Sequence, residues 1–335
     1  METRSSTQLL TDTHGRTVRD LRISVTDRCN LRCVYCMPAE GMAWLPKEQL
    51  LTYEEITRFA RVCLDLGVTA IRLTGGEPTV RADLPVLVRM LNELRPGLDL
   101  SLTTNALKLA AMATELREAG LKRVNVSLDT LDRQRFHQIA RRDRLADVVL
   151  GLEAAERVGF HPIKVNAVLM RGFNEDEAVP LARWGREHGY EVRFIEWMPL
   201  DFQHGWSREK LVPAAEILEQ IGAVFPLELA PGEDPSAPAT LYRYQDGGGT
   251  VGVIASVTRP FCGHCDRIRL TADGQIRTCL FSLKEYDFRA AMRGGASDGE
   301  IADLLRAAVL RKEPGHLINS PYFQQPARGM SAIGG

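Results

Sequence analysis

Short apolar runs alternate with longer segments of helical periodicity from residue 21 to about residue 198. Within the short runs, apolar and polar residues follow the two-residue period of a β-strand, and the intervening segments repeat their apolar positions every three to four residues. Strands that alternate with helices favour a parallel sheet built from βα units. We predict six strands, at residues 21–26, 70–74, 99–104, 123–129, 163–169 and 191–197.

The number of βα units limits the architecture. Thr52 and Glu55 predict a capping box at the start of a helix over residues 52–67, and similar helical segments lie between the other strands. Six units are fewer than the eight of a closed barrel. We therefore predict an α/β fold, an incomplete (βα)6 TIM-type barrel, with a C-terminal α+β region that closes the barrel mouth.

The alternation of strands and helices ends after about residue 212, which predicts a domain of residues 1–212 followed by a region of residues 213–335. A Pro- and Gly-rich loop at residues 229–240 opens that region. Short strands are expected at 241–244, 249–256 and 267–279, the last with a hairpin turn at its "ADGQ" sequence, and a helix at 298–310.

Polar residues occupy one face of several predicted strands. In a parallel sheet wrapped by helices, the apolar face meets the helices, so these residues should point into the concave interior and make it a wet cavity. Four of them are cations, and converging cations favour a polyanionic ligand such as a nucleoside triphosphate. The alternative is that they pair with interior acids such as Asp129 and Glu196. The cations are Arg22, Arg72, Lys164 and Arg193.

The overall composition mainly excludes certain binding partners and locations. The chain has 335 residues and a formal charge of −1, so no global basic field favours nucleic acid or an anionic membrane. No apolar run reaches the roughly 20 residues of a membrane span, and the polar N-terminus lacks a secretory h-region. We expect a soluble cytoplasmic protein.

The cysteines fall into two groups of three, with Cys63 apart from both at helical spacing among apolar residues. The first trio is Cys29, Cys33 and Cys36, in a CxxxCxxC spacing directly after the first strand, and the second trio is Cys262, Cys265 and Cys279. A closed zinc site and a simple electron-transfer cluster each take four protein ligands, so a trio leaves one metal position open. The alternative is zinc completed by a histidine, His264 or His316 in the case of the second trio.

The CxxxCxxC spacing, followed by "TGGEP" after the second strand, resembles the signature of the radical S-adenosylmethionine (SAM) enzymes. That resemblance implies a [4Fe-4S] cluster on the first trio whose open iron binds SAM. It also implies SAM contacts from Tyr35, Gly76, Ser127 and Met198.

The second trio, with "DRIRLTADG" between its cysteines, resembles the GTP 3′,8-cyclases, the family of molybdenum cofactor biosynthesis protein A. The resemblance covers nearly the whole chain. It implies a second [4Fe-4S] cluster that binds the guanine of GTP, and a C-terminal double glycine that reaches into the active site. It further implies GTP contacts from Arg22, Arg72, Thr103, Lys164, Arg193, Arg267, Ile268 and Arg269.

The family reaction would then be expected. A 5′-deoxyadenosyl radical removes hydrogen from C3′ of GTP, and the carbon radical adds to C8 to give 3′,8-cyclo-7,8-dihydro-GTP. An electron-donor protein and the next enzyme of the molybdopterin pathway are the implied partners, and the chain is expected as a monomer or homodimer. Three residues depart from the family pattern and could weaken triphosphate binding, namely Asp266, Ala106 and Ala70.

Two other functions remain open from the residues. One is a radical SAM enzyme with a second cluster that modifies a peptide or another small molecule. The other is a non-enzymatic metal-binding or RNA-binding module with two zinc sites.

Overall fold

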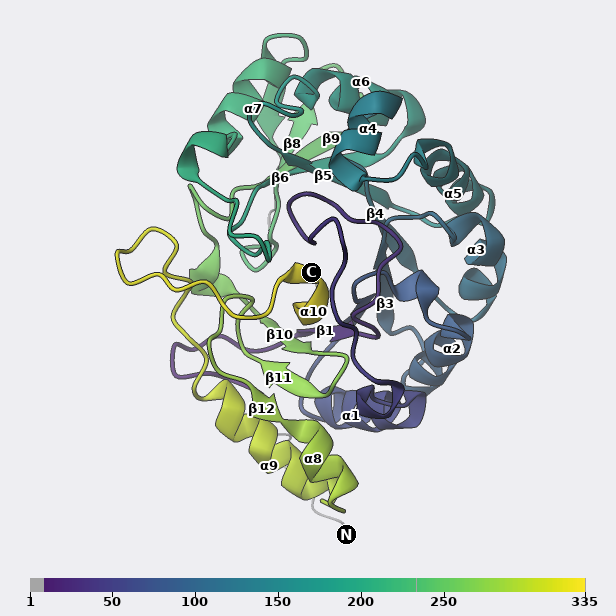
Figure 1. Ribbon diagram of the computed structural model, residues 1–335, viewed down its shortest axis with the longest axis vertical. Helices are drawn as coiled ribbons and strands as arrows, with labels where there is room; N and C mark the ends of the chain where they lie inside the picture. Colours follow the sequence, from purple (N-terminus) through teal and green to yellow (C-terminus); the bar gives the residue numbers. More distant parts are fainter. Residues whose placement is uncertain (1–8, 233, 335) are drawn as a thin grey trace.

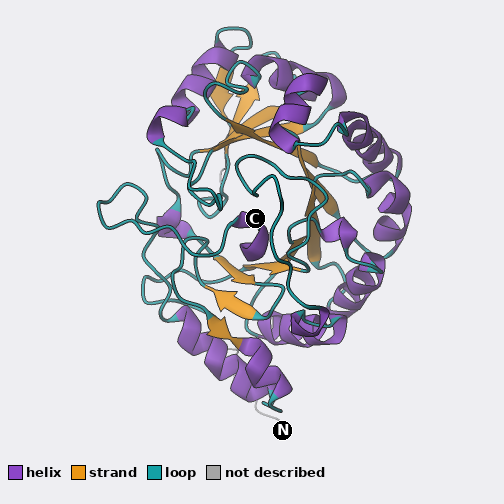
Figure 2. Ribbon diagram, in the orientation of Figure 1, coloured by secondary structure: helices purple, strands orange, loops and turns teal. Residues whose placement is uncertain are grey.

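Six parallel strands form the inner wall of the fold, and each ends within two residues of its predicted position. The computed structural model describes residues 9–232 and 234–334. The strands curve around a central space (Figures 1 and 2), in the order of the sequence. They are β1 (Asp20–Ser24), β2 (Ala70–Thr74), β3 (Asp99–Thr104), β4 (Arg123–Ser127), β5 (Ile163–Leu169) and β6 (Glu191–Glu196).

Helices cover the convex face of this wall (Figure 1). The first begins with the predicted capping box, because Thr52 accepts from the backbone of Glu55 while the Glu55 side chain accepts from the backbone of Thr52. The helices are α1 (Tyr53–Asp65), α2 (Leu84–Leu94), α3 (Leu109–Glu118), α4 (Arg133–Ala140), α5 (Leu145–Arg157), α6 (Ala178–His188) and α7 (Ala214–Gly222).

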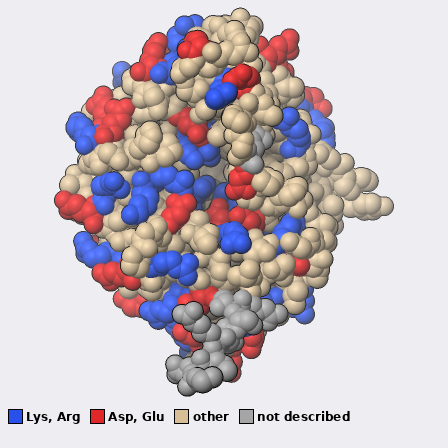
Figure 3. All heavy atoms as spheres, turned by 180° about the vertical axis from the view of Figure 1, so that it is seen from behind, with Lys and Arg blue, Asp and Glu red and all other residues tan. Residues whose placement is uncertain are grey.

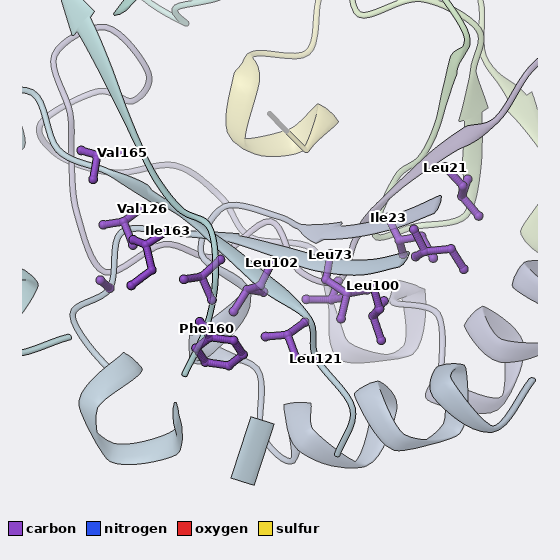
Figure 4. Close-up of a cluster of buried hydrophobic side chains, with 14 of the residues drawn as sticks. Leu21, Ile23, Leu73, Leu100, Leu102, Leu121, Val126, Phe160, Ile163 and Val165 are labelled. Atoms are coloured by element: carbon purple, nitrogen blue, oxygen red, sulfur yellow. The ribbon is translucent and has the colours of Figure 1, made fainter. Parts of the chain in front are cut away.

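The apolar positions of the strands face these helices. Figure 4 shows side chains such as Ile23, Leu73, Leu102 and Val126 between the sheet and the helices, and all four are fully buried. Burying one such side chain contributes about 1.5–3 kcal/mol. The apolar face is therefore committed to the core, and the polar face is left for the central space.

The C-terminal region does more than close the mouth, because it extends the same sheet at both edges. The strand β9 (Thr250–Ile254) pairs in parallel with β6, and β10 (Arg267–Leu270) pairs in parallel with β1. The expected hairpin is present, since β10 pairs antiparallel with β11 (Gln275–Arg277). The outer strands are β7 (Leu227–Leu229), β8 (Thr240–Tyr244) and β12 (Tyr286–Asp287). The sheet stays open, as an incomplete barrel requires. The division at residue 212 remains a prediction.

The chain finishes inside the ring. After α8 (Phe288–Arg293) and α9 (Asp298–Val309), the short helix α10 (Met330–Ile333) lies in the central space (Figure 1). Gly335, the second residue of the predicted double glycine, lies outside the described residues.

None of the described helices has the length and apolar content that a membrane span needs. Among the described residues, short 3-10 turns lie at η1 (Lys47–Gln49), η2 (Pro78–Val80), η3 (Arg208–Lys210) and η4 (Cys262–His264).

Candidate functional site

A cavity of about 320 Å³ lies on the concave side of the sheet. On the face opposite to that of Figure 1, Lys and Arg side chains gather around a hollow (Figure 3). Most of the predicted site residues line the cavity. They are Arg22, Cys29, Cys33, Tyr35, Cys36, Arg72, Gly76, Thr103, Ser127, Arg193, Met198, Cys262, Cys265, Arg267, Arg269 and Cys279.

Two predicted site residues do not line the cavity. The Ile268 side chain is fully buried in the hydrophobic core, because it alternates with the inward-facing Arg267 and Arg269 along β10. Only its backbone is left for a ligand. Lys164 is half-buried, and its ammonium lies 4.0 Å from the Glu191 carboxylate.

The strand register places the two cysteine trios at opposite ends of the cavity. The first trio follows β1, at the carboxyl ends of the parallel strands. Because Asp20 of β1 lies opposite Arg267 of β10, the preceding Cys265 lies beyond the amino ends of the same strands. Cys279 follows the antiparallel β11 back toward that end. The inward-facing arginines of β1 and β10 therefore lie between the two trios.

These arginines carry buried donors that the protein leaves unused. Arg22 Nε and Arg267 Nη2 are buried and have no hydrogen-bond acceptor among the described residues. Burial, followed by the charge of Arg72, lowers the pKa of Arg22 to about 10. Burial and then Arg22 likewise lower the pKa of Arg269. An anion would stabilise this group of cations and satisfy the free donors.

The counter-charges are acids that the sequence analysis did not name. Asp20 lies 3.6 Å from Arg22, and Glu191 lies 2.5 Å from Arg193. Each acid stands two residues before its partner on the same strand, so the two-residue period contained the signal. The expected alternative partners were wrong, because Asp129 accepts from the Tyr35 hydroxyl at 2.7 Å and Glu196 accepts from backbone N–H groups near α7 and β9.

The first trio lies in a loop fixed by backbone hydrogen bonds, among them Val34 N–H to the Ile139 carbonyl at 3.0 Å. Burial raises the pKa of Cys29 to about 11 and that of Cys36 to about 12. These thiols stay protonated at neutral pH until a metal displaces the proton. Cys29 Sγ also accepts weakly from the Leu31 N–H and the Asn105 amide, as cluster sulfurs commonly do.

The "TGGEP" loop needs its glycines because it lies against the backbone of the first-trio loop. A Cβ on Gly75 would lie 2.6 Å from the Thr26 carbonyl oxygen, and one on Gly76 would lie 2.5 Å from that of Asp27. The Gly76 N–H donates to the Thr26 carbonyl at 2.7 Å and is already used. The buried Glu77 then fixes the loop to β3 through hydrogen bonds from Thr104 and Asn105.

One of the two histidines of the zinc alternative, His316, is already engaged in hydrogen bonds. The His316 Nε2 hydrogen-bonds to the Ser256 carbonyl at 2.8 Å, and its Nδ1 faces the Ile318 N–H, so both ring nitrogens are engaged. Within the part of the chain that the structure describes, no three His, Cys, Asp or Glu side chains converge on one point. The thiol-only donor set of each trio therefore fits an iron–sulfur cluster.

The C-terminal tail connects the two halves of the cavity. The buried guanidinium of Arg269 donates to the Gly334 carbonyl. At the other end of α10, the Ser331 hydroxyl donates to Met42 Sδ at 3.7 Å, and Ser331 lies close enough to the Cys36 thiol to favour its ionised form. The tail thus contacts both the arginines between the two trios and the first-trio loop.

The three departures from the family pattern have different surroundings. Ala106 has a φ of 64°, a left-handed conformation that costs an alanine about 1–2 kcal/mol and suits glycine. Ala70 lies between Asp20 and Asp99 in the sheet register, where a basic residue would meet both carboxylates. Asp266 has a buried Oδ1 without a hydrogen bond, 3.5 Å from Arg267.

Comparisons with known proteins show the family of the chain. Two family models match, the Radical SAM superfamily over residues 23–185 and Molybdenum Cofactor Synthesis C over residues 190–318. The chain is 53% identical to the GTP 3′,8-cyclase of Streptomyces coelicolor over 334 residues, 99% of this chain and 98% of that protein. It is 52% identical to the GTP 3′,8-cyclase of Mycolicibacterium smegmatis over 333 residues, 97% and 92% of the two chains.

Solved structures match the fold. Streptococcus suis SuiB aligns with a TM-score of 0.61 at 16% identity and covers 94% of this chain and 77% of its own. SuiB bound to S-adenosylmethionine aligns with a TM-score of 0.59 at 15% identity, covering 95% and 78%. The incomplete barrel and the cysteine loop after β1 therefore define a radical SAM enzyme. Within that class, the chain belongs to the GTP 3′,8-cyclase family.

Proposed function

We propose that this protein converts GTP to 3′,8-cyclo-7,8-dihydro-GTP, the first step of molybdenum cofactor biosynthesis. The identity of 53% to a GTP 3′,8-cyclase over nearly the full length supports the reaction. The observation that carries the proposal is a single cavity with a cysteine trio near each end and buried arginines between them. Such a cavity suits a substrate whose base reaches the second trio and whose charged group lies among the arginines between the trios.

Each trio would hold a [4Fe-4S] cluster, Cys29, Cys33 and Cys36 the first and Cys262, Cys265 and Cys279 the second. When bound, the first cluster and SAM supply the 5′-deoxyadenosyl radical that takes hydrogen from C3′ of GTP. The second cluster is the finer part of the proposal, supported by the thiol-only donors and the engaged His316 ring. Its open iron would take the guanine.

The remaining residues orient the two small molecules. We assign SAM to the carboxyl ends of the strands, where Tyr35, Gly76, Ser127 and Met198 lie. We assign the triphosphate to the free arginine donors. The GTP contacts proposed are Arg22, Arg72, Thr103, Lys164, Arg193, Arg267, Ile268 through its backbone, and Arg269. The tail, which contacts Cys36 and Arg269, would keep water from the reacting atoms.

The proposal also covers the surroundings of the enzyme. A reducing compartment keeps the cysteines of both trios as thiols that can bind iron, which supports a cytoplasmic location. The reaction needs a protein that donates electrons, and its product passes to the next enzyme of the molybdopterin pathway. The chain would work as a monomer or a homodimer.

The test is anaerobic reconstitution with iron and sulfide, followed by SAM and a reductant. The formation of 5′-deoxyadenosine should depend on GTP and should not be supported by ATP or by a peptide. Formation of 5′-deoxyadenosine without GTP dependence would contradict the proposed cyclase activity.

As a matched check on the substrate site, Arg193→Ala should weaken GTP binding while SAM binding is unchanged. An equal loss of both would contradict the assigned site.

The side chain of Lys164 predicts how GTP binding depends on pH. Burial, and then the charge of Arg193, lower the pKa of Lys164 to about 8. A bound triphosphate favours the ammonium and raises that pKa, so above about pH 8 binding must take up a proton. We expect calorimetry to show the dissociation constant rising about tenfold per pH unit above that value. In Lys164→Arg, which stays charged, most of this rise should disappear, and its persistence would contradict the assignment.

A further inference from the structure

The ammonium of Lys312 is buried beside the second trio. Lys312 follows α9 and is 3% exposed. Its Nζ donates to the Arg267 carbonyl at 2.8 Å and to the Thr278 carbonyl. Thr278 directly precedes Cys279, and Arg267 follows Cys265 by two residues. The ammonium therefore joins the two segments that carry the second trio.

This cation has no carboxylate partner. In residues 9–232 and 234–334, no Asp or Glu oxygen lies within 4.0 Å of Lys312 Nζ, and the neighbouring Glu313 carboxylate is occupied by the hydroxyls of Thr278 and Ser282. Arg16, another buried cation nearby, differs because it is paired with Asp12 at 2.6 Å. A buried ammonium without a counter-anion costs several kcal/mol. A bound anion would therefore stabilise the ammonium of Lys312.

The groups that face Lys312 identify that anion. Lys312 Nζ is bonded to the backbone of Thr278, which adjoins Cys279, and to that of Arg267, two residues after Cys265. The Glu313 carboxylate next to it already accepts from two hydroxyls, so the groups on these segments that can become anionic are the thiols of the second trio. The first trio is surrounded differently, because the acids Glu77 and Asp129 face Cys29 and Cys33.

We propose that Lys312 is the counter-charge of the second iron–sulfur cluster and makes that cluster easier to reduce. The inference rests on the second cluster of the proposed function. Three cysteinates make a [4Fe-4S] cluster an anion, and each added electron increases its negative charge. A fixed positive charge nearby stabilises the reduced form more than the oxidised form, which raises the reduction potential. Lys312 is thus a positioning residue that acts through the cluster.

The experiment uses the full-length chain with Cys29, Cys33 and Cys36 replaced by alanine, so that only the second trio can bind iron. In this background we compare Lys312→Gln, Lys312→Met and Lys312→Arg. Lys284→Met is the matched control, because it removes the same charge from an exposed position. Iron and sulfide per chain are measured first, and a potentiometric titration followed by electron paramagnetic resonance then gives the midpoint potential.

The neutral variants should titrate at a more negative potential than the background protein, while Lys312→Arg and Lys284→Met should stay close to it. Loss of iron from both neutral variants, with iron retained in Lys312→Arg, would also support the counter-charge. Neutral variants with full iron and an unchanged potential would overturn it, as would loss of iron from Lys312→Arg. A background protein that binds no iron, together with only about four irons in the protein that keeps both trios, would instead overturn the second cluster of the proposed function, and this inference with it.

Discussion

Replacing Gly334 by alanine should reduce GTP-dependent formation of 5′-deoxyadenosine by roughly a hundredfold, with little change in melting temperature. Gly334 has a φ of 86°, in the left-handed region, and an added Cβ would lie 2.6 Å from Thr74 Oγ1 and 2.9 Å from Ser24 Cβ. Both neighbours belong to strands at the centre of the sheet, which cannot move aside. The tail must move instead, and Arg269 then loses its carbonyl acceptor.

The expected separation between activity and stability follows from where the tail lies. It contributes a short helix in the cavity and no strand of the sheet, so its displacement should leave the core intact. Gly299→Ala is the matched control, because its Cβ would meet only Ser297 Oγ at 3.9 Å, and alanine is favoured in a helix. Full activity in Gly334→Ala, or a melting temperature that falls in parallel with activity, would contradict a specific role for the tail.

The sequence predicted which face each cation occupies but not its height along the strand. Alternation fixes the face of a residue, so Arg22 and Arg193 were correctly placed inside. The same rule placed Asp129 inside, yet this residue follows β4 at the carboxyl end and contacts Tyr35. The true counter-charges, Asp20 and Glu191, stand at the amino ends. The two-residue period could have found both acids, but it could not exclude Asp129 and Glu196, because the relative depth of residues on different strands depends on the register between the strands.

The extra parallel strands were missed for a similar reason. β9 and β10 were expected as short strands, but nothing local indicates that one pairs with β6 and the other with β1. β10 lies more than 240 residues from β1 in the chain, and such pairing is selected by tertiary packing. The pairing determines the site, because it brings Arg267 and Arg269 beside Arg22.

Lys312 shows a further limit of sequence reasoning. In a linear sequence, a lysine after an amphipathic helix is typical of a solvated helix end. Only the fold reveals that this lysine is buried against two backbone carbonyls. A buried cation without a carboxylate partner is therefore found from the structure and not from the sequence.

Replacing Cys262, Cys265 and Cys279 together by alanine should halve the iron content, from about eight to about four per chain. GTP binding should weaken strongly, while SAM binding at the first trio should persist. Separate hydrogen bonds hold the two trios in place. The Val34 N–H of the first-trio loop donates to the Ile139 carbonyl of α4, and Arg16 donates to the Cys262 carbonyl. Because Arg16 contacts the backbone and not the thiol, the loop should keep its position when the sulfur is lost.

The control for this triple replacement is the seventh cysteine. Cys63 is fully buried in α1 among core side chains, as its helical spacing predicted. Cys63→Ala removes a sulfur without touching either trio, so it should leave the iron content at the parental value and cost only a small amount of stability. Iron near zero in the triple variant would mean that the two sites assemble together, and unchanged iron would exclude the second trio as cluster ligands. The expected result is that the triple variant loses half of the iron and its GTP binding but keeps its SAM binding. That result would assign GTP to the second trio and SAM to the first.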